Sequence, residues 1–146
     1  MATTTTDAAA SESWLTALCA REHARCFACR PRHAGGLGLR FRLQPDGTVC
    51  ADWVTPAGYE SYDGILHGGL IATALDSAMV HALFARNVVA RTGELDVRYR
   101  QPVTIGCTVS VRAWLTNAYP PLYQLEAEVC QSGAVCAHAR AKFMST

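Results

Sequence analysis

The chain of 146 residues has the length of a single domain, and its 50% hydrophobic residues are enough for a sizeable core. The formal net charge is only +1 and the basic residues are scattered, which argues against a nucleic-acid-binding surface. Asp76 interrupts the longest apolar run, so no segment reaches the roughly 20 apolar residues that a membrane-spanning helix needs.

The first ten residues, MATTTTDAAA, are small, polar and of low complexity. They predict a disordered tail over residues 1–10, followed by a single domain over residues 11–146. The tail has neither the basic region nor the apolar region of a signal peptide. Without a signal peptide or a membrane span, the chain is expected to be cytoplasmic. The seven cysteines are odd in number, which favours free thiols over a disulfide framework.

Hydrophobic periodicity predicts the elements in chain order. Ahead of the longest apolar run, the patterns predict a helix over residues 11–23, a turn-rich segment over 26–38, and a hairpin of two strands over 37–44 and 48–54. Pro45-Asp46-Gly47 is the turn of this hairpin, because Pro fixes φ and Gly allows a positive φ. A loop over residues 56–64 follows.

A long apolar helix is predicted over residues 67–86, and four strands follow it over residues 88–100, 107–115, 123–129 and 134–143. Because no βαβ unit repeats, the sheet is expected to be antiparallel. The helix is apolar nearly all round, so one sheet alone cannot cover it. A second copy of the chain is the simplest cover for its far side.

Asp76 is the most informative residue, because it lies inside this apolar helix. Burying an ionised carboxylate costs several kcal/mol unless it is paired or hydrogen-bonded. Nine residues earlier, His67-Gly68-Gly69 lies at the predicted helix start, where backbone N–H groups are unpaired and the helix dipole is positive. Together these features indicate a site rather than a scaffold.

Four segments carry a resemblance to a known family. They are CFAC (26–29), GLGLRF (36–41), GILHGG (64–69) with Asp76, and TGELDVRYRQPV (92–103). With them the chain resembles the hotdog-fold acyl-CoA thioesterases, most of all the phenylacetic-acid-degradation type, over about residues 26–143. The resemblance implies an α+β hotdog fold, with a curved antiparallel sheet of about six strands around one long helix and a short N-terminal helix. It also implies a homodimer or homotetramer that hydrolyses coenzyme A thioesters without a cofactor.

The resemblance also implies roles for residues around the helix start. Asp76 would be the general base or the nucleophile, and the Gly68 N–H would hold the oxyanion, helped by the Gly69 N–H. His67 would orient the loop or bond near the thioester. Ser77 follows the acid directly, where relatives often carry a small polar residue that holds the water. A surface position on the helix without a functional role is an equally good interpretation of Ser77.

Substrate binding is expected from the loop before the helix and from the strand after it. Some relatives carry an amide in that loop, whereas this chain offers Glu60, Ser61 and Asp63. Tyr62 would line the acyl pocket or belong to the core. The strand residues Arg98 and Arg100 would meet the coenzyme A phosphates or form a solvated face.

Gly68 and Asp76 are eight residues apart, which on one helix is about 12 Å along the axis. One carbonyl carbon cannot contact both. Two antiparallel helices packed about 8–10 Å apart would bring the start of one near the middle of the other. The site is therefore expected to be composite, with Gly68 from one subunit and Asp76 from its partner.

Alternatives remain for the metal content and for the function. His23, Cys26, Cys29 and His33 have the ligand types of a zinc site, but no second C-x-x-C follows and the resembled family does not depend on zinc, so no metal is expected. His81 is expected to be a core or interface histidine. The open functional alternatives are a hydratase or dehydratase of acyl thioesters on the same fold and a non-catalytic acyl-CoA-binding module.

Overall fold

The computed structural model describes residues 9–146 and confirms the predicted order of elements. The helices and strands are α2 (Glu12–Glu22), η1 (Arg32–Ala34), β1 (Arg42–Leu43), β2 (Val49–Val54), α3 (Gly68–Phe84), β3 (Ala90–Tyr99), β4 (Thr108–Tyr119), β5 (Leu122–Gln131) and β6 (Ala134–Ser145). Most of the tail predicted over residues 1–10 lies outside the described range. Of its two described residues, 9 and 10, Ala10 packs against the core.

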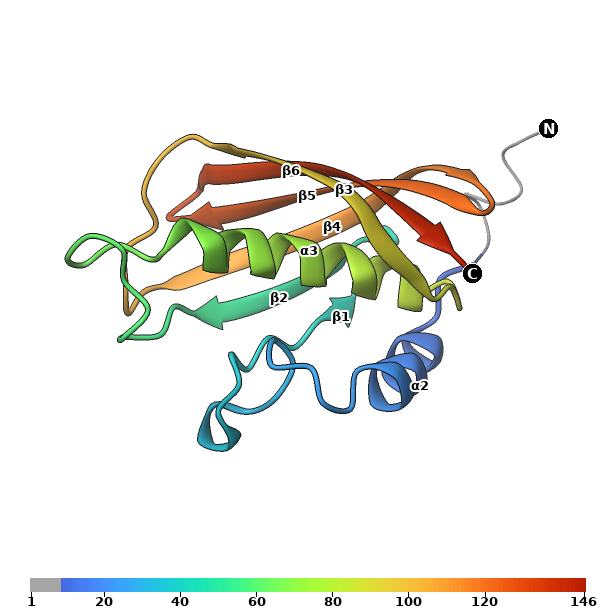
Figure 1. Cartoon of the computed structure of the whole chain (residues 1–146), viewed down its shortest axis with the longest axis horizontal. Helices are drawn as coiled ribbons and strands as arrows, with labels where there is room; N and C mark the ends of the chain where they lie inside the picture. The colour runs from blue at the N-terminus through green and yellow to red at the C-terminus, as the bar shows by residue number, and fades with distance from the viewer. Residues whose placement is uncertain (1–8) are drawn as a thin grey trace.

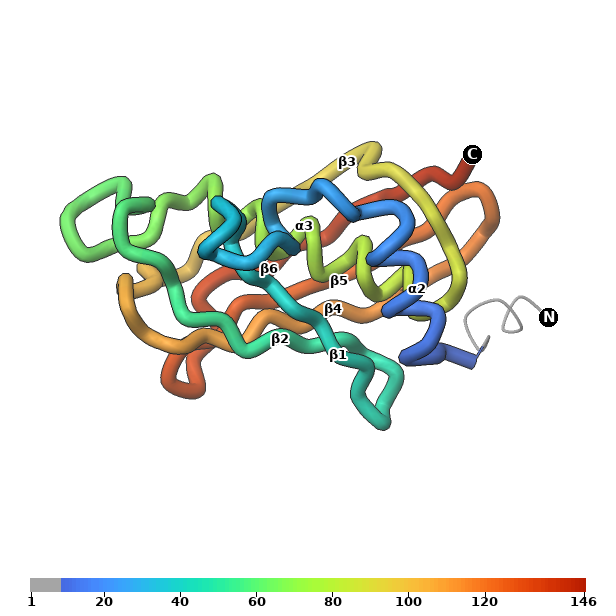
Figure 2. The backbone as a smooth tube through the Cα atoms, turned by 90° about the horizontal axis from the view of Figure 1, so that it is seen from below, coloured from blue at the N-terminus to red at the C-terminus, as the bar shows by residue number. Residues whose placement is uncertain are grey.

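One curved antiparallel sheet wraps α3, as the resemblance implied (Figure 1). Its six strands follow the order β1-β2-β4-β5-β6-β3, and each neighbouring pair is antiparallel. Helix α2 and the loop after it pack on α3 away from the sheet (Figure 2). The α+β hotdog fold is therefore confirmed. Within residues 9–146, none of the helices has the length and apolar character needed to cross a membrane.

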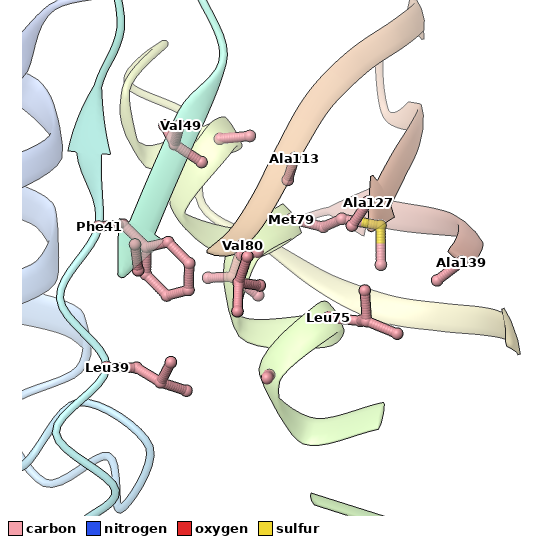
Figure 3. Close-up of a cluster of buried hydrophobic side chains, with 14 of the residues drawn as sticks. Leu39, Phe41, Val49, Leu75, Met79, Val80, Ala113, Ala127 and Ala139 are labelled. Atoms are coloured by element: carbon pink, nitrogen blue, oxygen red, sulfur yellow. The ribbon is translucent and has the colours of Figure 1, made fainter. Parts of the chain in front are cut away.

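The core between α3 and the sheet sets how the helix is rotated (Figure 3). Three neighbouring strands, β4, β5 and β6, each contribute a small, fully buried residue under the helix: Ala113, Ala127 and Ala139. Leu75 and Met79 of α3 are also fully buried, and being four residues apart they lie on one helix face. Asp76 follows Leu75 by one residue, so its side chain is turned about 100° away from that face.

Helix α3 is less covered at its N-terminal half than its composition predicts. Eleven of its 17 residues are buried, and eight of these form the unbroken run from Ser77 to Phe84 in the C-terminal half. A stripe of residues on one side stays exposed or half-buried: Gly69, Ala72, Thr73 and Asp76. We call this the open stripe of α3. The prediction of near-complete burial therefore holds within one chain only for the second half of the helix.

The strand predicted over residues 37–44 is wrong in extent, because only Arg42–Leu43 pairs with β2. The predicted alternation is nevertheless observed, with Leu37, Leu39 and Phe41 buried. The Leu37 and Leu39 N–H groups donate to the carbonyls of Phe27 and Ala28, at 2.8 and 2.9 Å. The segment therefore pairs with the turn that precedes it rather than with the sheet.

Candidate active site

The start of α3 is organised by His67. Its backbone N–H donates to the Tyr59 carbonyl, at 2.9 Å, and its Nδ1 accepts from the Gly69 N–H, at 2.8 Å. His67 is thus the N-cap residue, which fits its expected role of orienting this turn. The Gly69 N–H is engaged by that cap, which differs from its expected role as a second oxyanion donor.

Gly68 keeps its backbone N–H free. Within residues 9–146 this N–H has no hydrogen-bond acceptor, as expected for the first residue of a helix. The Tyr99 hydroxyl donates to the Gly68 carbonyl, at 2.7 Å. Burial raises the pKa of the Tyr99 phenol, which keeps its proton available for this bond. Tyr99 on β3 therefore anchors the helix start while the N–H remains available.

Asp76 lies half-buried beside the same strand. Its Oδ1 accepts a hydrogen bond from the Thr92 hydroxyl, at 2.6 Å, and in the described part of the chain no Lys, Arg or His forms an ion pair with it. A carboxylate held by one neutral donor keeps its second oxygen free to take a proton or to attack a carbonyl. Thr92 was not predicted from the sequence.

Gly68 and Asp76 remain far apart in the chain. Helix α3 runs from Gly68 to Phe84 without a break, so the eight-residue spacing gives about 12 Å along the axis. Thr92 and Tyr99 sit near opposite ends of β3 and bind Asp76 and Gly68 respectively. The free N–H and the carboxylate therefore lie at two separate points along the contact between α3 and β3.

Ser77 is buried, with 5% of its surface exposed, and its hydroxyl has no hydrogen-bond partner among residues 9–146. Nothing in the structure couples this hydroxyl to Asp76. His81 is a core histidine, as expected, and its Nδ1 lies 2.7 Å from the Ser77 carbonyl oxygen.

The loop before α3 presents different residues from those expected. A hollow of about 400 Å³ lies at the helix start and is lined by Gly58, Tyr59, Glu60, His67, Gly69 and Leu70. Tyr59 and Glu60 line it, whereas Ser61 and Tyr62 do not, and the Tyr62 side chain is 78% exposed. Within one chain, Ser61 and Tyr62 are therefore not brought to the helix start.

Arg98 and Arg100 lie on the other face of the sheet. They flank Tyr99, whose side chain reaches α3, so strand alternation turns both arginines away from the helix. With Arg140 they line a hollow of about 470 Å³, together with Asp96, Glu126 and His138. The structure therefore brings the two predicted arginines together, but not with Asp76 of the same chain.

The family model described as the thioesterase superfamily matches residues 63–141, which is more than half of the chain. The chain therefore belongs to the thioesterase superfamily. The matched range includes the start of α3, Asp76 and Thr92. No curated protein sequence matches the chain.

Solved structures share the fold at low sequence identity. The PaaI protein from the phenylacetic acid degradation operon of Escherichia coli has a TM-score of 0.77 at 15% identity, over 92% of this chain and 95% of that one. The thioesterase superfamily protein RHA08564 has a TM-score of 0.72 at 20% identity, with 76% of this chain covered but only 58% of that one. Smu.793 of Streptococcus mutans, solved bound to acetyl-CoA, has a TM-score of 0.65 at 20% identity, over 68% and 82% of the two chains.

Proposed function

We propose that the protein is an acyl-CoA thioesterase. The observation that carries this proposal is the half-buried Asp76 carboxylate, which is held by Thr92 alone and keeps one oxygen free. Membership of the thioesterase superfamily and the acetyl-CoA bound to Smu.793 support coenzyme A thioesters as the substrate class.

In the proposed reaction, Asp76 removes a proton from water as the water oxygen bonds to the thioester carbon. The carbonyl oxygen becomes an oxyanion and accepts a hydrogen bond from the free Gly68 N–H, where the helix dipole adds positive potential. The carbon–sulfur bond then breaks, and coenzyme A leaves as the thiol with the proton that Asp76 took up. In the covalent variant, the Asp76 oxygen bonds to the carbonyl carbon as the carbon–sulfur bond breaks and the coenzyme A thiolate leaves. Water then hydrolyses the acyl anhydride, which frees the acid and the Asp76 carboxylate and supplies the proton of the thiol.

We further propose that each site is shared between two subunits of a homodimer. About 12 Å along one axis separates Gly68 from Asp76, so one carbonyl cannot meet both in a single chain. The open stripe of α3 and the edge strand β3 lie side by side. Within the described chain the stripe is uncovered, and β3 pairs only with β6, on one of its two edges. A second copy on this surface covers the stripe and sets the two helices antiparallel.

Coenzyme A phosphates are proposed to bind Arg98 and Arg100, together with Arg140. Three guanidinium groups around one hollow suit the charge and the planar oxygen geometry of phosphates. Since these arginines face away from α3 of their own chain, they would serve a site of another copy, which favours a homotetramer.

All seven cysteines are free, which supports the proposed cytoplasmic location.

A thiol-release screen over acyl-CoA thioesters tests the proposed activity. The panel contains short, medium and aromatic acyl groups, and a thiol-reactive dye measures the coenzyme A set free. We expect turnover of at least one member above the uncatalysed rate. Hydration of an enoyl-CoA without thiol release, or saturable binding with no release from any thioester, would contradict the proposal.

Mixing two inactive variants tests whether the site is shared. Asp76→Ala and Gly68→Pro dimers each lack one half of every site, whereas a mixed dimer restores one complete site out of two. We expect activity to return when the two proteins exchange subunits, up to about half of the wild-type activity per mixed dimer. Native mass spectrometry of differently tagged chains confirms the exchange, and silence of confirmed mixed dimers rules out a shared site.

A further inference from the structure

Five cysteine and histidine side chains meet where α2 and the turn after it pack on the last turns of α3. They are Cys19, His23, Cys26, Cys29 and His81. Within this group, the potential ligand atoms of Cys19, Cys29 and His81 all lie within 4.8 Å of one another, and so do those of His23, Cys26 and Cys29. Only His23, Cys26 and Cys29 of this set stand out in the sequence, as a C-x-x-C preceded by one histidine.

Three distances in the cluster are close to those between neighbouring ligand atoms of a tetrahedral metal site. His81 Nε2 lies 3.4 Å from Cys19 Sγ and 3.6 Å from Cys29 Sγ, and His23 Nδ1 lies 3.8 Å from Cys29 Sγ. Zinc bonds of about 2.3 Å to sulfur and 2.0–2.1 Å to nitrogen place adjacent ligand atoms roughly 3.5–3.8 Å apart. Cys19, Cys29 and His81 are therefore spaced as three ligands of one ion, and a fourth ligand from His23 or Cys26, which share a group only with Cys29, would have to move toward it.

His81 is already oriented as a metal ligand. Its Nδ1 lies 2.7 Å from the Ser77 carbonyl oxygen, which can only accept, so Nδ1 carries the proton and donates it. In that tautomer the lone pair is on Nε2, which lies near both sulfur atoms. Phe41 and Phe84 pack against the ring and hold its plane. A histidine whose second nitrogen is fixed by a carbonyl is the usual outer support of a zinc ligand.

The cluster also has an entry path. Cys19, Cys29 and His81 line a cavity of about 250 Å³ whose other walls come from α2 and from the segment before β1. Cys19 and Cys29 are only half-buried, so an ion can reach their sulfur atoms without unfolding of the domain. Ligand identity, spacing, outer support and access are the features that a credible metal site must combine.

We propose that this cluster is a zinc site, with Cys19, Cys29 and His81 as ligands and His23 or Cys26 in the fourth position. A mixed thiolate and imidazole set suits Zn²⁺, which tolerates any tetrahedral arrangement. The ligand set differs from the combination of His23, Cys26, Cys29 and His33 considered from the sequence, because it includes Cys19 of α2 and His81 of α3 and leaves out His33. The ion would fasten α2 and the 26–29 turn to α3, five residues beyond Asp76.

Metal titration of untagged protein, purified with a reducing agent and stripped by a chelator, tests the site. We expect one Zn²⁺ per chain, bound in competition with a chromophoric chelator. Co²⁺ in its place should give the thiolate charge-transfer and strong visible bands of a tetrahedral site. Cys19→Ser and Cys29→Ser should each weaken binding by more than the roughly 10- to 100-fold that loss of an outer support causes. Cys107→Ser, at an exposed cysteine outside the cluster, should leave binding unchanged.

Circular dichroism of each variant separates loss of ligand from loss of fold, and the Co²⁺ spectrum of the wild-type chain needs no variant at all. Comparing His23→Ala with Cys26→Ser identifies the fourth ligand by which of the two weakens binding. Absence of Zn²⁺ binding by the reduced wild-type chain would overturn the proposal. So would a Co²⁺ spectrum without thiolate bands, or binding that persists unchanged in folded Cys19→Ser and Cys29→Ser chains.

Discussion

Replacing Asp76 with asparagine should lower kcat/KM for thioester hydrolysis by about 100- to 10,000-fold, the usual contribution of a positioned acid or base. The asparagine amide has nearly the same shape as the carboxylate. Its oxygen can still accept a hydrogen bond from the Thr92 hydroxyl, which lies 2.6 Å from Oδ1 of Asp76. It cannot remove a proton from water or form an acyl anhydride. The measurement is steady-state thiol release on the best substrate of the screen, with the variant's fold checked by circular dichroism.

Asp52→Asn is the matched control for this experiment. Asp52 is an exposed carboxylate on β2 whose nearest partner is Arg42, at 3.7 Å, and surface pairs of this kind contribute about 0–1 kcal/mol. The control should therefore keep wild-type turnover and stability. If Asp76→Asn also keeps full turnover on every active thioester, the carboxylate is not the base or the nucleophile.

Gly68→Pro should lower kcat by about 100- to 1,000-fold, as loss of one oxyanion donor does in other hydrolases. Proline removes the single N–H that the proposal assigns to the oxyanion, and it is well tolerated at the first position of a helix. The preceding His67 has φ −57° and ψ 131°, which is the extended conformation that a following proline requires. The helix start should therefore fold as before.

Gly68→Ala separates the lost N–H from the added carbon atoms. A Cβ at this position would lie 3.4 Å from the Tyr99 ring, which is ordinary van der Waals contact, and the N–H is kept. Gly68→Ala should retain kcat within about tenfold, so that the contrast between the two variants measures the N–H itself. Equal activity of the proline and alanine variants would remove Gly68 from the mechanism.

The zinc site and the thioesterase site can be tested independently. His81 lies in the C-terminal half of α3, away from the free Gly68 N–H at the helix start. Cys19 of α2 and Cys29 of the following turn pack against that half. Metal stoichiometry and the Co²⁺ spectrum are read without substrate. Failure of the zinc proposal would therefore leave the roles of Asp76 and Gly68 untouched, and failure of the thioesterase proposal would leave the metal site untouched.

The long helix and the strands after it were predictable because their signals are local. Period-two alternation marks each strand, and an apolar run interrupted by Asp76 marks the helix. The 37–44 strand was overpredicted for the same reason. Its alternation reports burial correctly, but whether a buried segment pairs with a sheet or with the turn at residues 27–28 depends on contacts distant from the pattern.

Spacing alone showed that Gly68 and Asp76 cannot act on one carbonyl within a single chain, since helical rise is a constant of the backbone. The partners of these residues became visible only in the folded chain. Thr92 reaches Asp76, Tyr99 reaches Gly68, and His81 turns toward Cys19 and Cys29, in each case across a contact between two elements. Periodicity records which face of an element is buried, whereas packing selects what that face touches, and the chemistry of both proposed sites depends on that choice.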